Sequence, residues 1–269
     1  MNLKDLTTRA GAGILYILVI LIGILGGPIS FLIVFGGVLC IGLFEFYRMV
    51  EKDTSHDISK IFNIVMGLLI FMSVFLYIKD INTIVLPVLI LIYLLLLFAT
   101  SIFIRREDIL HGIIYSVFGQ LYVTMPLSIL MLTTEYQAPL LALFIFIWVN
   151  DTAAYFFGSL IGKNKLIEHI SPKKSVEGFI AGIIFTLFAA LVFNSLYPEF
   201  SIIFWLGYAL IVTLFGTLGD LFESLIKRTC NVKDTGQLIP GHGGILDRID
   251  SLLIAAPAIY LYMLIIIEL

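Results

Sequence analysis

Charged residues gather in one stretch of this chain, residues 224–250, which reads SLIKRTCNVKDTGQLIPGHGGILDRID. The stretch combines carboxylates three residues apart, at Asp247 and Asp250, with basic side chains and several glycines. Carboxylate oxygens bind hard divalent cations, and basic groups and glycine amides bind phosphates. The composition of this stretch therefore predicts a site where phosphates meet a divalent cation.

Four polar side chains recur at helical spacing where this stretch begins. They stand at i, i+3, i+4 and i+7 on one helical face, and they are Asp220, Glu223, Ser224 and Lys227. As a purely structural feature, they would form a solvated helix end joined by a Glu223–Lys227 ion pair. Because Asp220 lies within the apolar part of the segment, where a charge is costly, we interpret the four residues as functional.

The metal-binding candidates are carboxylates, because the two cysteines have no ligand spacing and no histidine pair stands nearby. Hard oxygen ligands favour Mg²⁺ over zinc. We predict that Asp220 and Asp247 bind Mg²⁺, with Glu223 and Asp250 in support, and the presence of a second cation is left open. The alternative for Asp247 and Asp250 is simple helix capping, since carboxylates suit the positive end of a helix.

Basic side chains and backbone amides of the same stretch are candidates for binding phosphates. Glycine lets the backbone approach a ligand closely and present its amide. His242 is either a hydrogen-bond donor to phosphate or a structural turn residue, and both interpretations stay open. Besides His242, the candidate residues are Lys227, Arg228, Lys233, Gly243, Gly244 and Arg248.

A second polar segment lies earlier in the chain, where Asn150 and Asp151 interrupt an apolar run and Ser-Pro-Lys-Lys-Ser follows at 171–175. An ionisable residue within a span marks a functional site by default, although these two residues could instead make interhelical hydrogen bonds. The lysines and hydroxyls of the later segment offer donors to phosphate oxygens. We predict that Ser171, Lys173, Lys174 and Asp151 belong to the same phosphate-binding site.

The spacing of these residues resembles the signature of the phosphatidate cytidylyltransferases, also called CDP-diacylglycerol synthases. The resemblance rests on Ser-x-x-Lys-Arg, Lys-Asp and Pro-x-His-Gly-Gly-x-x-Asp-Arg-x-Asp, all within 224–250, and on the Ser-Pro-Lys-Lys segment followed by Glu-Gly. It implies an enzyme that joins CTP to phosphatidic acid and acts as a homodimer. Without the resemblance, the residues indicate a metal-dependent, phosphate-handling enzyme of the membrane.

Hydrophobic residues make up 60% of the 269 residues and charged residues 13%, which excludes an ordinary soluble domain. We expect an all-α, polytopic integral membrane protein of about nine transmembrane helices with a polar cleft on its cytoplasmic side. Each apolar run is long enough to cross about 30 Å of hydrocarbon. The runs lie near residues 10–27, 29–49, 61–78, 82–104, 110–133, 138–161, 176–197, 201–226 and 248–267.

Basic residues predict the orientation, because Lys and Arg near span ends stay on the cytoplasmic side. With nine spans, only Lys79 of the sixteen Lys and Arg falls on the opposite face. We therefore expect a multi-pass protein of the cell (plasma) membrane with its amino terminus and its site in the cytoplasm.

Two parts are expected along the chain: residues 1–135, the amino-terminal membrane helices, and residues 136–269, a catalytic half with cytoplasmic loops 162–175 and 224–250. The expected partners are CTP, phosphatidic acid and the lipid bilayer, with no nucleic acid. Two alternatives remain. A CTP-dependent polyprenol or phytol kinase would need a carboxylate base for its alcohol nucleophile. A transporter of a phosphorylated solute would place its binding residues near the membrane midplane.

Overall fold

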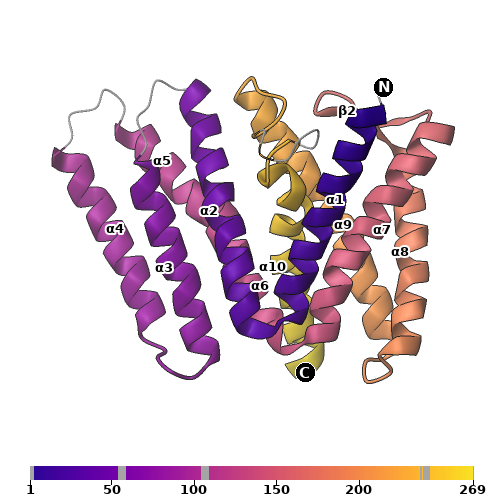
Figure 1. The fold of residues 1–269 in the computed structure, drawn as a ribbon, viewed down its shortest axis with the longest axis horizontal. Coiled ribbons are helices and arrows are strands. Elements are labelled where there is room, and N and C mark those ends of the chain that lie inside the picture. The colour runs from indigo at the N-terminus through magenta and orange to yellow at the C-terminus, as the bar shows by residue number, and fades with distance from the viewer. Residues whose placement is uncertain (1–2, 54–58, 104–108, 237, 239–242, 269) are drawn as a thin grey trace. The chain divides into compact units, whose positions relative to one another are not determined.

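The computed structural model describes residues 3–53, 59–103, 109–236, 238 and 243–268, and its helices are drawn in Figure 1. The α-helices are α1 (Leu3–Leu25), α2 (Gly27–Asp53), α3 (Lys60–Ile78), α4 (Val85–Phe103), α5 (Ile109–Gly119), α6 (Met125–Leu132), α7 (Gln137–Ile161), α8 (Val176–Leu196), α9 (Ile202–Thr229) and α10 (Leu246–Glu268). Two short strands, β1 (Lys165–Ile167) and β2 (Ser171–Ser175), lie between α7 and α8.

The predicted class, an all-α polytopic membrane protein, is confirmed. Within the described residues, eight helical segments are long and apolar enough to cross a membrane, and Gly11–Leu25 of α1 is a shorter apolar helix. Each predicted span coincides with one of these segments. Apolar runs of this length form helices in hydrocarbon because a helix pairs nearly all of its own backbone polar groups.

The span predicted at 110–133 is not a uniform helix. It consists of α5, a π-helical turn at Gln120–Thr124, α6 and a 3₁₀ turn at Thr133–Glu135. The side-chain amide of Gln120 donates to the Asn63 carbonyl oxygen at 2.7 Å, and the Thr124 hydroxyl donates to Gln120 Oε1 at 2.7 Å. The π turn thus carries two buried polar side chains that hydrogen-bond within the bundle.

The linker 162–175, expected to be a cytoplasmic loop, contains a β-hairpin. Its strands are antiparallel, with Lys165 opposite Ser175 and Ile167 opposite Ser171. The carboxylate of Glu177 accepts hydrogen bonds from the Lys163 backbone amide at 3.0 Å and from Asn164 Nδ2 at 2.7 Å. These contacts fasten the start of the hairpin to the first turn of α8.

The chain forms two compact units, Met1–Glu135 with Thr229–Ile249, and Tyr136–Arg228 with Asp250–Leu269. In the first unit, α2 packs against α1 and α3, and its side chains Phe35, Phe46 and Tyr47 are fully buried. A cavity of about 130 Å³ lies between α3, α4 and α5 of this unit, where polar residues such as Asn63 and Ser116 line it together with apolar ones such as Phe62 and Ile113.

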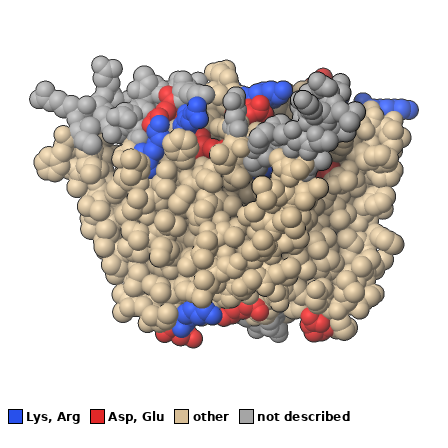
Figure 2. Space-filling model, viewed as in Figure 1, with Lys and Arg blue, Asp and Glu red and all other residues tan. Residues whose placement is uncertain are grey.

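In the second unit, α7 and α8 pack along each other and share an aromatic core with α9. Phe146, Trp205 and Tyr208 are fully buried there, with ring centroids 5.9–6.4 Å apart. Figure 2 shows the charged side chains of the visible face at helix ends and in connecting segments, whereas the helix flanks carry uncharged residues. This distribution fits helices whose flanks lie in a bilayer.

Candidate active site

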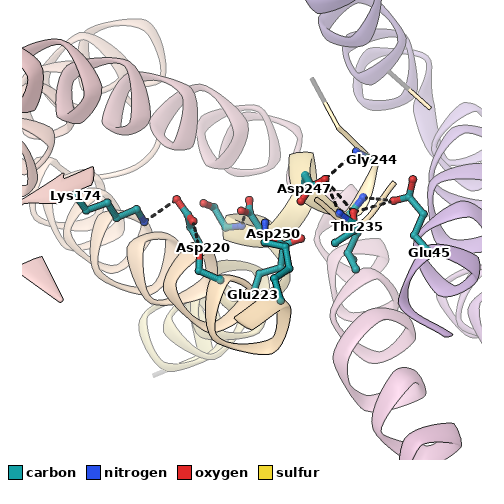
Figure 3. Close-up of polar contacts among 12 residues, drawn as sticks. Glu45, Lys174, Asp220, Glu223, Thr235, Gly244, Asp247 and Asp250 are labelled. Atoms are coloured by element: carbon teal, nitrogen blue, oxygen red, sulfur yellow. Dashed lines mark hydrogen bonds and ion pairs between the residues drawn. The ribbon is translucent and has the colours of Figure 1, made fainter. Parts of the chain in front are cut away.

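Three carboxylates lie close together in the second unit, Asp220 and Glu223 on α9 and Asp250 on α10 (Figure 3). The ammonium group of Lys174, on strand β2, points toward Asp220, and its Nζ lies 2.6 Å from Asp220 Oδ2. Lys227 Nζ lies 2.7 Å from Glu223 Oε2. The Glu223–Lys227 pair, which belonged to the purely structural interpretation of this helix face, is thus present, but the helix end is not solvated there, because Glu223 is 0% exposed.

Small residues let α9 and α10 approach closely enough to bring these carboxylates together. A Cβ on Gly219 would lie 2.5 Å from the Asp250 carbonyl oxygen and 3.0 Å from Ser251 Cα. Only a residue without a side chain fits between these backbones. Since Gly219 directly precedes Asp220, this close approach of α9 and α10 lies beside the carboxylates.

The negative charges of this group repel one another. Asp250 is partly buried, and Glu223, Asp220 and Asp151 all lie close enough to raise its electrostatic energy. Carboxylates that gather within an apolar bundle need a compensating positive charge. Lys174 and Lys227 supply part of it.

These donors suit a hard cation, because they are all carboxylate oxygens. In the described part of the chain, however, no group of three Asp, Glu, His or Cys residues is placed to enclose a metal ion. The four predicted ligands thus match Mg²⁺ in chemistry, and metal binding stays a prediction.

Asp247, in the first unit, organises the loop that precedes α10. Its Oδ2 accepts three hydrogen bonds, from the Thr235 amide at 3.1 Å, the Thr235 hydroxyl at 3.0 Å and the Gly244 amide at 2.8 Å. Gly243 has φ +84, which favours glycine, and a Cβ there would stand 2.6 Å from the same oxygen. The predicted glycine amides therefore lie beside Asp247, and that of Gly244 is bonded to it.

Glu45, on α2, contacts this loop and was missed by the site prediction. It is 4% exposed, and its Oε2 accepts the Leu246 amide at 2.9 Å and lies 3.4 Å from the Thr235 hydroxyl (Figure 3). The only signal in the sequence was the Glu45-Phe46 pair inside an apolar run, which an interfacial position explains equally well. Contacts between residues so far apart in sequence leave no periodic pattern.

The remaining predicted residues lie on α7, on β2 and between Arg228 of α9 and Arg248 of α10. Asn150 Nδ2 donates to Asp151 Oδ1 at 3.1 Å, and Asn150 Oδ1 is buried with no hydrogen-bond partner among the described residues. Ser171 is partly buried in β2. Four basic residues are exposed, namely Lys173, Arg228, Lys233 and Arg248. His242 lies outside the described residues.

Comparison with known proteins assigns the chain to a family. The sequence pattern of the cytidylyltransferase family matches residues 7–266. This chain belongs to the cytidylyltransferase family. The match covers both units and every predicted site residue.

Individual members of the cytidylyltransferase family match over shorter segments. A Staphylococcus saprophyticus protein named phosphatidate cytidylyltransferase is 46% identical over 123 residues, 45% of this chain and 47% of its own length. A Staphylococcus aureus protein of the same name is also 46% identical, over the same shares. A Bacillus subtilis protein of that name is 49% identical over 116 residues, 42% of this chain and 43% of its own. These alignments span less than half the length of the relatives.

Proposed function

We propose that this chain is a phosphatidate cytidylyltransferase, which transfers the cytidylyl group of CTP to phosphatidic acid and releases pyrophosphate. The observation that carries the proposal is the family match over residues 7–266. The names of the relatives suggest the acceptor lipid. The ion pairs Lys174–Asp220 and Lys227–Glu223 support the proposal, because they bring two ammonium groups, which can bind phosphate oxygens, to the carboxylates that would bind a cation.

The proposed reaction joins two anions. A phosphate oxygen of phosphatidic acid attacks the α-phosphorus of CTP, and the bond from that phosphorus to the oxygen bridging to the β-phosphorus breaks. The nucleophile is already ionised and needs no general base, so the main obstacle is repulsion between the two substrates. Lys174 and Lys227 would lower this repulsion, and the exposed Lys173, Arg228, Lys233 and Arg248 would attract both anions to the site.

The carboxylates are the proposed Mg²⁺ ligands. Asp220, Glu223 and Asp250 form one group in the second unit, and Asp247 of the first unit is proposed as a further ligand on its place in the sequence motif, three residues before Asp250. When bound, the cation would neutralise charge on the phosphates in the transition state. Lys174 would then exchange its contact with Asp220 for a contact with phosphate.

We also propose the cellular setting that the sequence predicted. The protein would lie in the plasma membrane with its site open to cytoplasmic CTP, because nine spans would leave only Lys79 of the sixteen basic residues on the face opposite the site. The family resemblance further suggests a homodimer. Light scattering of the detergent-solubilised protein, corrected for bound detergent, should give the mass of a dimer. A monomer mass would contradict the homodimer.

Purified protein supplied with phosphatidic acid and CTP labelled at either the α- or the γ-phosphate tests the reaction. We expect label from α-labelled CTP to enter the lipid. Label from γ-labelled CTP should not enter the lipid and should be released in pyrophosphate. Transfer of the γ-label to an added polyprenol or phytol would instead identify a CTP-dependent kinase. Uptake of a phosphorylated solute into vesicles without any transfer of label would identify a transporter.

A further inference from the structure

Glu45 is a buried carboxylate to which the proposed reaction gives no task. It lies on α2 with 4% of its surface exposed, in a helix whose neighbouring side chains Phe46 and Tyr47 are fully buried. A charged group buried in a membrane bundle is costly unless it is well paired. Its partners therefore indicate what it does.

The partners of Glu45 belong to the loop before α10 and to the start of that helix. Glu45 Oε2 accepts the Leu246 amide at 2.9 Å, where the positive end of the α10 dipole attracts an anion. The same oxygen lies 3.4 Å from the Thr235 hydroxyl. One carboxylate thus holds both ends of the segment that joins Thr235 to α10.

Gly236 and Gly244, at the two described ends of this segment, lie against the carboxylate. A Cβ on Gly236 would overlap Glu45 Oε1, and a Cβ on Gly244 would overlap Glu45 Oε2. The absence of side chains at both positions lets the backbone close on the Glu45 carboxylate. These two glycines therefore serve an internal contact.

The same segment orients Asp247. The hydroxyl of Thr235 lies within 3.4 Å of Glu45 Oε2 and 3.0 Å of Asp247 Oδ2, and the amides of Thr235 and Gly244 also donate to Asp247. Every group that donates to Asp247 in these contacts comes from a residue that also packs against Glu45. The rotamer of Asp247 consequently depends on the position of Glu45.

We propose that Glu45 is a positioning residue: by accepting hydrogen bonds from the loop and from α10, it orients Asp247 for cation binding. The inference rests on the proposed function in taking Asp247 as a ligand of the cation. Residues that orient a ligand typically change metal affinity by about 10–100-fold when they are replaced.

The test measures Mn²⁺ binding to the full-length protein in detergent without nucleotide, from the electron paramagnetic resonance signal of free Mn²⁺. Glu45→Ala should weaken Mn²⁺ binding by about tenfold or more. Glu45→Gln keeps an acceptor oxygen at the Oε2 position, so its loss should be clearly smaller. Glu51→Ala is the matched control, because Glu51 lies on the same helix and its carboxylate pairs with Lys60 at 2.5 Å. It should leave Mn²⁺ affinity unchanged.

A second comparison separates positioning from general stability. In an Asp247→Asn background, Glu45→Ala should cause little further loss of Mn²⁺ affinity, because its effect passes through Asp247. The proposal would be overturned if Glu45→Ala lowered Mn²⁺ affinity in the Asp247→Asn background as much as it does in the wild type. It would also be overturned if Glu45→Gln and Glu45→Ala lowered Mn²⁺ affinity equally. If Glu45→Ala does not fold, Thr235→Val removes the hydroxyl between the two carboxylates. Unchanged Mn²⁺ affinity in this variant would also overturn it.

Mn²⁺ binding is read without CTP or lipid, so this experiment is independent of the reaction. If the wild type does not transfer the α-label but Glu45→Ala weakens Mn²⁺ binding, the proposed function is rejected and the role of Glu45 is retained. Normal transfer in the wild type with unaltered Mn²⁺ affinity in Glu45→Ala would reject the role of Glu45 alone.

Discussion

Lys174 Nζ lies 2.6 Å from Asp220 Oδ2, so strand β2 places its fourth residue on a carboxylate of α9. The preceding residue, Lys173, is exposed. Neighbouring residues of a strand point to opposite faces, which accounts for the difference. The sequence predicted both lysines as phosphate contacts, and the structure distinguishes Lys174 as the one that reaches the carboxylates.

Lys174→Met should reduce the kcat/KM for cytidylyl transfer by at least about tenfold, ~1.4 kcal/mol of transition-state stabilisation. The variant loses the ammonium group beside Asp220 that would contact phosphate. Initial rates at several CTP concentrations give the value. Lys165→Met removes the same charge from an exposed position of β1 and should retain at least half of the activity. Equal losses in both variants would mean that only the net charge of the hairpin matters.

Asp250→Asn should make the metal-free protein more stable and less active. The substitution relieves repulsion from Glu223, Asp220 and Asp151, and each kcal/mol gained raises Tm by about 2–4 °C. Activity should fall by about tenfold to a hundredfold if Asp250 supports the cation. Thermal unfolding in a chelator measures the first effect. Glu199→Gln, at an exposed position between α8 and α9, should change neither quantity.

Mg²⁺ itself should stabilise the wild type, by about 2.7 kcal/mol at a concentration one hundred times its Kd. The gain should shrink in Asp250→Asn and in Asp220→Asn, because each variant removes one charge from the carboxylate group. The measurement is the unfolding temperature in a chelator and at rising Mg²⁺. Equal gains in the wild type and in both variants would place the cation elsewhere.

Two glycines on α9 provide a paired test of the contact between α9 and α10. Gly219→Ala should destabilise the protein by about 1–3 kcal/mol, because its Cβ would meet backbone atoms of Asp250 and Ser251 at 2.5–3.2 Å. Gly216→Ala should be neutral or stabilising, since its Cβ would lie 3.7 Å from Ser251 Cβ and alanine favours a helix. Thermal unfolding decides, and destabilisation of equal size in both variants would argue against a close approach at Gly219.

The orientation in the membrane can be measured with introduced cysteines. A cysteine at Asn82, in the exposed turn between α3 and α4, should react with a membrane-impermeant thiol reagent on intact cells. A cysteine at His169, in the exposed turn of the hairpin, should react only after the cells are opened. Both are made with Cys40 and Cys230 changed to serine. The reverse pattern would invert the predicted topology.

The spans could be predicted from the sequence because their apolar length is set by the thickness of the bilayer. The Glu223–Lys227 pair could be predicted as well, because residues four apart on a helix are neighbours. Hydropathy could not reveal the π turn at Gln120–Thr124, since a turn with one extra residue has the same composition as an α-helical turn.

Long-range packing accounts for what the site prediction missed. The sequence suggested that glycines of the 224–250 stretch let the backbone approach a ligand, which stays a prediction, and it did not indicate that Gly236 and Gly244 leave room for Glu45. Nothing in the local pattern distinguishes a glycine that faces a substrate from one that faces a buried side chain. The same limit applies to Lys174, whose partner Asp220 lies on a helix that begins well after the hairpin ends.

The closure of Gly236 and Gly244 around Glu45 also constrains how this protein can diverge over evolution. Alanine at either glycine position would collide with the carboxylate, and a residue without an acceptor oxygen at position 45 would leave the Leu246 amide without this partner. Single changes are therefore disfavoured, whereas a paired change, such as Glu45→Asp with Gly236→Ala, conserves the total volume. Across the family, positions 45, 236 and 244 should be either fixed or exchanged together. Frequent relatives with alanine at 236 and glutamate at 45 would contradict this coupling.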